Sequence, residues 1–131
     1  MIARLRTESP IRFIQTAREL LAHTAFYLNR LPKTMRFVWH VPLTDMCRDI
    51  LSSLVEANSI PVGDMRRGEL FSHSLRKLDV LEENLASLAF EGNWFSAIGE
   101  TAFEGWARLI DAERSLIRGV VRYDAKKMGD R

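Results

Sequence analysis

The sequence has few of the residue patterns on which chemistry in proteins depends. Its single cysteine, Cys47, cannot form an intrachain disulfide, which favours a reducing compartment such as the cytoplasm. The glycines are scattered and match neither the P-loop nor the dinucleotide-binding fingerprint. No apolar run reaches the roughly 20 residues of a transmembrane helix, and no signal peptide is visible. We therefore expect a cytoplasmic protein that uses no cofactor and does not enter a membrane.

Side chains for catalysis or metal binding are also poorly placed. Two Glu–His pairs occur at i,i+4 spacing, Glu19 with His23 and Glu69 with His73. Di-iron sites in helical bundles need Glu-x-x-His, which is i,i+3 spacing, so these pairs are more simply interpreted as exposed pairs on a helix surface. Cys47 lies on an apolar stripe, which is typical of a core residue rather than a nucleophile. No pair of carboxylates stands in an apolar setting where pKa tuning is expected. These patterns predict no metal site, no catalytic residue and no enzyme activity.

Helical periodicity is the strongest positive signal. Ser9 is a suitable N-cap before Pro10 at a first helical position, and Asp64 is a suitable N-cap for a later helix. No segment alternates with period two for long, which predicts an all-α fold. The apolar spacing predicts helices over approximately residues 10–31, 42–59, 64–91 and 96–123, followed by a polar tail over residues 124–131.

Short connections between amphipathic helices favour antiparallel neighbours. We therefore predict that residues 1–131 form a single domain, an up-down-up-down antiparallel four-helix bundle whose first and last helices adjoin. Trp106 is expected in the core. Trp39 and Trp94 fall in connections, where they either cover an end of the bundle or anchor a partner.

Charge is unevenly distributed along the chain. The formal net charge is +2, but residues 1–36 carry +5, residues 37–104 carry −6 and residues 105–131 carry +3. A locally basic surface attracts nucleic acid even on a nearly neutral protein. The two basic ends belong to helices that should lie side by side.

Basic side chains recur every four residues near the carboxyl end, which aligns them in a ridge on the last predicted helix. Such a ridge is often only solvated surface, but the adjoining first helix is basic as well, and phosphate binding depends on summed local charge. Few aromatic residues are interleaved with the ridge, so contact with the nucleic-acid backbone is favoured over base stacking. The candidate nucleic-acid or partner-binding residues are Arg12, Arg18, Arg114, Arg118, Arg122, Lys126 and Lys127.

Three motifs in order carry a family resemblance. The first motif consists of Leu31-Pro32-Lys33, Arg36-Phe37, the predicted helix over residues 43–54 and Glu56-Ala57-Asn58. The second is "RKLDVLEENLASLA" and the third is "RLIDAERSLIRGVVRY". Together they resemble the accessory variability determinant (Avd) family of diversity-generating retroelements. That family is related to the four-helix-bundle proteins encoded in 23S rRNA intervening sequences.

The resemblance implies both an assembly and a role. Members of that family form a homopentameric barrel of four-helix bundles. They bind the reverse transcriptase of the same element and its template RNA, and they support mutagenic retrohoming into a variable gene. By resemblance, this chain is a non-enzymatic accessory subunit with those partners.

An alternative function stays open at this point. The chain could be a structural, oligomeric helical-bundle interaction module without nucleic-acid binding. Salt-dependent retention of RNA distinguishes the two functions, because interactions with phosphates weaken steeply with ionic strength.

Overall fold

The long helices account for most of the chain. A computed structural model describes residue 5 and residues 7–129. No strand occurs in this described part, so the all-α prediction is confirmed for it. The elements are α1 (Arg12–Leu28), a 3-10 turn η1 (Lys33–Met35), a π-helical turn η2 (Arg36–His40), α2 (Val41–Ser59), α3 (Met65–Ala89), the short α4 (Phe95–Ile98) and α5 (Glu100–Gly129).

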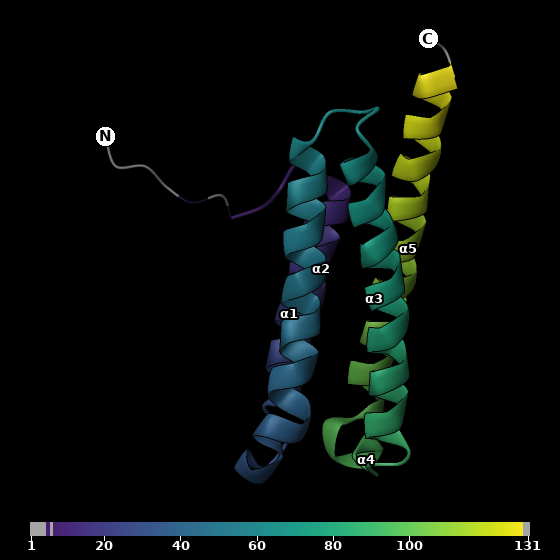
Figure 1. The fold of residues 1–131 in the computed structure, drawn as a ribbon. Helices are drawn as coiled ribbons and strands as arrows, with labels where there is room; N and C mark the ends of the chain where they lie inside the picture. The colour runs from purple at the N-terminus through teal and green to yellow at the C-terminus, as the bar shows by residue number, and fades with distance from the viewer. Residues whose placement is uncertain (1–4, 6, 130–131) are drawn as a thin grey trace.

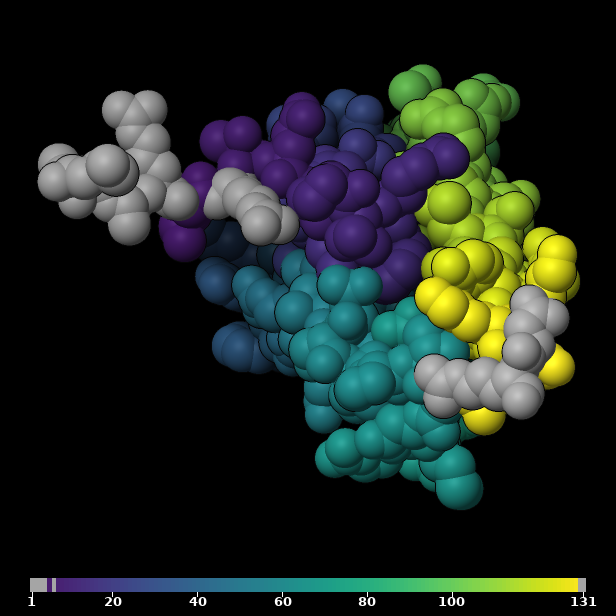
Figure 2. All heavy atoms as spheres, turned by 90° about the horizontal axis from the view of Figure 1, so that it is seen from above, coloured from purple at the N-terminus to yellow at the C-terminus, as the bar shows by residue number. Residues whose placement is uncertain are grey.

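The long helices pack around one shared interior. Helix α1 contacts α2 and α5, while α3 contacts the same two helices from the other side. Successive long helices run in opposite directions in Figure 1, and α4 lies at the end opposite to the α2–α3 turn. Figure 2 shows the start of α1 beside the carboxyl-terminal part of α5. The first and last long helices therefore adjoin, as predicted.

Apolar side chains at helical spacing form the core. On α2, Leu43, Cys47, Ile50 and Leu54 are each at most 1% exposed. This stripe confirms that Cys47 is a core residue. Trp106 of α5 is also 1% exposed, as the sequence predicts.

Helix starts follow local capping chemistry. Asp64 caps α3 as predicted, because its carboxylate accepts a hydrogen bond from the backbone N–H of Arg66 at 3.0 Å. Helix α1 begins at Arg12 rather than at Pro10. Ser9 nevertheless acts at this end: its hydroxyl accepts from the Ile11 N–H at 3.2 Å, and its own N–H donates to the Gln15 side chain at 2.8 Å. The N-cap residue of α1 is Ile11 rather than the predicted Ser9, and these two bonds instead tie the preceding segment to the first turns of the helix.

The last predicted helix differs at both ends. Gly99 has φ +105°, a conformation that glycine adopts without steric penalty, and it separates α4 from α5. Helix α5 continues to Gly129, through most of the predicted polar tail. Asp124 stabilises this extension by pairing with Arg67 of α3 at 2.7 Å, and Lys126 and Lys127 interact favourably with the helix dipole. The rest of the predicted tail, residues 130–131, lies outside the described residues.

The connections carry the other two tryptophans. Trp39 and Trp94 are half-buried and pack against the core, and both rings lie close to Gly92. They therefore cover one end of the helices, the first of the two roles considered for them. The segment Arg36–His40 forms a π-helical turn that leads directly into α2.

A buried threonine joins three helices. The Thr24 hydroxyl on α1 donates to the Leu20 carbonyl and accepts from the indole Nε1–H of Trp106 on α5, both at 2.8 Å. The thiol of Cys47 on α2 donates weakly to the same oxygen at 3.4 Å. Thr24 is fully buried, so each of these polar groups is satisfied away from water.

Replacing Leu54 with Asp is expected to prevent stable folding. Leu54 is 0% exposed, and an unpaired buried carboxylate costs several kcal/mol, comparable to the whole stability of a small domain. The neighbouring Val55 is 49% exposed, so Val55→Asp is the matched control and should melt close to the parent. Circular dichroism on heating measures both. If Leu54→Asp melts like the parent, the α2 stripe is not the core.

Replacing Thr24 with Val is expected to destabilise the fold by about 1 to 3 kcal/mol, because it leaves the buried Trp106 N–H without an acceptor. Urea titration followed by circular dichroism gives the free energy of unfolding. Thr101→Val is the control, since Thr101 is exposed. In a double-mutant cycle, Trp106→Phe should cost less in the Thr24→Val background than alone. Additive losses would contradict the hydrogen bond.

Candidate nucleic-acid and partner interface

The outward face of α5 carries the basic ridge. Buried Ile110 and Ile117 fix which side of α5 faces the interior. On an ideal helix Arg122 and Lys126 lie about 140° and 180° around the axis from Ile117. Arg118, Arg122 and Lys126 are accordingly exposed. Among the described residues none forms an ion pair with these three cations.

The ridge borders a shallow surface hollow of about 300 Å³. Arg114, Arg118 and Arg122 line it together with Asp111 and Ser115. The structure thus brings three predicted residues to one surface. At the end of the helix, the ammonium of Lys127 lies 5.6 Å from the ring centroid of Tyr123, which is 59% exposed. This pair places one aromatic ring beside the cations.

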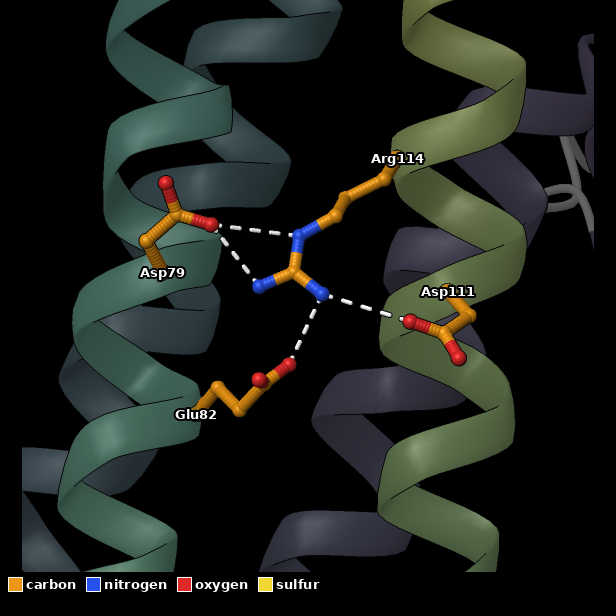
Figure 3. A network of polar contacts seen from close by, with 4 residues as sticks. All are labelled: Asp79, Glu82, Asp111 and Arg114. Atoms are coloured by element: carbon orange, nitrogen blue, oxygen red, sulfur yellow. Dashed lines mark hydrogen bonds and ion pairs between the residues drawn. The ribbon is translucent and has the colours of Figure 1, made fainter.

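Arg114 differs from the rest of the ridge because acidic side chains surround its guanidinium (Figure 3). It donates to Asp79 at 2.8 Å, to Glu82 at 2.7 Å and to Asp111 at 3.3 Å. Burial alone would lower its pKa, but the hydrogen bonds to Glu82 and Asp79 raise the pKa of Arg114 above the ordinary value. Its side chain is 15% exposed. Arg114 therefore joins α5 to α3 and is not available to a phosphate while these bonds persist.

The two predicted residues on α1 lie on different flanks. His23 marks the flank that meets α5, since its ring contacts Ala102 of that helix. Arg12 lies about 20° from His23 around an ideal helix, whereas Arg18 lies about 140° away. Arg18 donates to the Thr7 carbonyl at 3.0 Å. Arg12 therefore lies on the flank of α1 that meets α5, and Arg18 belongs to another part of the surface.

His23 is not the exposed partner of Glu19 that its spacing predicts. Its Nε2–H donates to the Ala102 carbonyl at 2.8 Å, and its ring lies 5.1 Å from Trp106. Gly105 makes room for this ring, because a β-carbon at that position would overlap the imidazole. Burial lowers the pKa of His23, although the hydrogen bond to Ala102 opposes that shift. His23 is therefore a neutral packing residue between α1 and α5.

The other candidates for chemistry are also structurally engaged. His73 pairs with Asp49 across α2 and α3 at 2.9 Å rather than with Glu69. Burial raises the pKa of the Cys47 thiol to about 11, which leaves it protonated and unreactive at neutral pH. No group of three His, Cys, Asp or Glu side chains within the described residues is arranged to hold a metal ion.

Glu113 is a buried carboxyl group that the sequence patterns missed. It is 0% exposed, and neither of its carboxylate oxygens has a hydrogen-bond partner in the described structure. Burial raises its pKa to about 8, and the nearby charge of Glu19 adds to the shift. The structure therefore buries a single carboxyl in an apolar setting rather than a pair, since Glu19 is exposed. The signal is present in the sequence, because Glu113 falls in step with Ile110 and Ile117 on the apolar stripe.

None of the helices in the described part of the chain combines the length and the apolar character that a membrane crossing requires. Comparison with known proteins gives no match to a family model, to a curated protein or to a solved structure.

Replacing Glu113 with Gln is expected to flatten the pH dependence of stability. In the unfolded chain the carboxyl ionises near its ordinary pKa of 4.5, whereas in the fold it keeps its proton up to about pH 8. Stability should therefore fall as pH rises from about 5 to 8 and then level off, with a loss of up to about 5 kcal/mol. Glu113→Gln lacks this ionisation, so its free energy of unfolding should rise relative to that of the parent across that pH range.

Urea titrations at pH 5, 7 and 9 measure the effect as the difference between parent and variant. Taking the difference removes the contribution of His23, whose lowered pKa acts in the opposite sense at acid pH. Glu104→Gln, an exposed substitution on the same helix, is the control and should follow the parent. Parallel stability curves for parent and Glu113→Gln would contradict a buried, shifted carboxyl.

Proposed function

We propose that this chain is a non-enzymatic accessory protein of a diversity-generating retroelement. In this proposal it is an up-down-up-down four-helix bundle that assembles into a homopentameric barrel in the cytoplasm. It binds the reverse transcriptase of the same element and the template RNA, and it supports mutagenic retrohoming. The motif resemblance suggests the role, and the all-helical fold, in which α1 adjoins the helix that carries the basic ridge, is compatible with it.

One observation carries the nucleic-acid part of the proposal. Arg118, Arg122 and Lys126 are exposed along about 12 Å of α5 without ion-pair partners among the described residues. Arg12 lies on the flank of α1 that meets this helix. Cations spaced in this way suit several phosphates of an RNA backbone, whichever bases they carry. Tyr123 and Lys127 add one exposed ring and one further charge at the same end.

The environment of Arg114 favours the alternative, an interaction module without nucleic-acid binding. Its three carboxylate partners remove one cation from the ridge and place negative charge beside it. The proposed RNA interactions therefore depend on the carboxyl-terminal half of the ridge. Arg114 serves instead as a structural link to α3.

Changing Arg118, Arg122 and Lys126 together to Gln should weaken RNA binding and reduce its salt dependence. Each phosphate that the variant no longer binds lowers the log–log salt slope by about one unit, and the weakening should be similar for unrelated RNA sequences. Filter binding or fluorescence anisotropy over a series of salt concentrations measures both quantities. Gln preserves helix propensity, so the fold should survive.

The matched control changes Lys33, Arg36 and Arg48 to Gln, which removes the same charge from exposed positions on η1, η2 and α2 rather than on α5. It should retain most of the RNA affinity and the salt slope. If both triple variants lose affinity equally, net charge rather than the ridge determines binding. If the ridge variant keeps its slope, RNA binds elsewhere or not at all, and the alternative function is favoured.

The chain is expected to form an oligomer, with five copies suggested by the resemblance. Basic residues 1–36 and acidic residues 37–104 give neighbouring copies complementary charge. Light scattering at moderate salt should give about five times the 15.1 kDa mass of one chain. A monomer at micromolar concentration would rule out the proposed assembly.

A further inference from the structure

An apolar groove of about 360 Å³ lies between α3 and α5, near the end of the molecule that carries α4. Small side chains, Ala86 of α3 and Ala107 of α5, line its length, and aromatic rings line the α4 end. Glu82 and Asp111 are the charged residues in its lining, and no Lys or Arg is among the described lining residues. The groove is therefore apolar along most of its length and acidic at one end.

The aromatic rings of the groove form a continuous series. Phe90 stacks on Phe95 at 6.1 Å, Phe95 stacks on Phe103 at 5.3 Å, and Phe103 lies 5.1 Å from Trp106. Trp106 is held in turn by its hydrogen bond to Thr24. Because each ring packs against the next, the wall is preformed. Phe90 is nevertheless 72% exposed, which is unfavourable unless a partner covers it.

The acidic end of the groove has more negative charge than its neighbours neutralise. Asp79, Glu82 and Asp111 share the single guanidinium of Arg114, as Figure 3 shows. Three carboxylates and one cation leave a local charge of −2. The carboxylate side chains of Asp79 and Asp111 are 66% and 77% exposed, so they can accept further donors. This end suits a Lys or Arg side chain of a ligand.

We propose that the groove binds a basic amphipathic helical segment of another protein. Its apolar side chains would lie against Phe90 and Phe103, and the alanines would let its backbone approach closely. Its Lys or Arg side chains would meet the acidic end. Helices bind in grooves by this combination of apolar anchors at i, i+3, i+4 and i+7 with matched charge. The proposal goes beyond the RNA-binding function, since the groove is lined by α5 residues that precede Arg114, whereas Arg118 and Arg122 follow it; Asp111 borders both surfaces.

A labelled peptide of about 14 residues, with Leu at i, i+3, i+4 and i+7 and Lys at the other positions, is the probe. A peptide with Glu in place of Lys is its control. Fluorescence anisotropy should show saturable binding of the Lys peptide and at least about tenfold weaker binding of the Glu peptide. Equal binding of the two peptides would overturn the proposal.

Variants test the location of the site. Phe90→Ala should weaken binding of the Lys peptide at least about fivefold, whereas Phe37→Ala should not, although Phe37 is 80% exposed. Asp111→Asn should weaken it about two- to threefold and reduce its salt dependence, whereas Asp45→Asn, on exposed α2 surface, should not. The change of Arg118, Arg122 and Lys126 to Gln should not weaken peptide binding, because it removes cations from the hollow that Asp111 also lines, so failure here is separable from failure of the RNA proposal.

Two results would overturn the proposal at this step. The first is equal peptide affinity for Phe90→Ala and Phe37→Ala, which would place the peptide elsewhere. The second is dissociation of an oligomer by Phe90→Ala but not by Phe37→Ala in light scattering, which would show that a second copy of this chain fills the groove.

Discussion

The hydroxyl group of Thr24 is the interaction on which the arrangement of the helices depends. It joins α1 to α5 through the Trp106 indole and to α2 through the Cys47 thiol, in a part of the core that water does not reach. A hydrogen bond from an indole has a direction, whereas apolar packing does not. Thr24 therefore favours the same rotation of α5 about its own axis that the burial of Ile110 and Ile117 requires. That rotation decides which of its side chains face the interior, the groove and solvent.

Once α5 is oriented, its flanks acquire separate roles. Ile110 and Ile117 enter the core, Phe103 and Ala107 turn to the groove, and Arg118 and Arg122 face outward. Arg114 lies on the boundary between the last two surfaces. By binding the carboxylates of α3 it closes the seam beside the groove, and it separates an acidic surface from a basic one. A protein with a net charge of only +2 can thus present two surfaces of opposite sign.

The sequence predicts the helices well, but it predicts poorly which side chains of different helices interact. Helical spacing is enough to identify the stripe around Cys47 and the cap at Asp64, because both depend on neighbours within one helix. The environment of Arg114 cannot be inferred in this way, since its principal partners, Asp79 and Glu82, are 35 and 32 residues away along the chain. The extension of α5 to Gly129 depends likewise on the pairing of Asp124 with Arg67, 57 residues away.

The carboxyl of Glu113 is buried without a hydrogen-bond partner, whereas every polar group around Thr24 has one. Its burial is tolerated because the group is protonated at neutral pH and then carries no charge to desolvate. Natural proteins retain such groups at a cost in stability, and here the cost falls on the helix that carries the basic ridge and one wall of the groove. The packing of α5 is therefore sensitive to pH, while the Thr24 hydrogen bond is not. Both surfaces depend on that one helix, so a loss of its packing would remove them together.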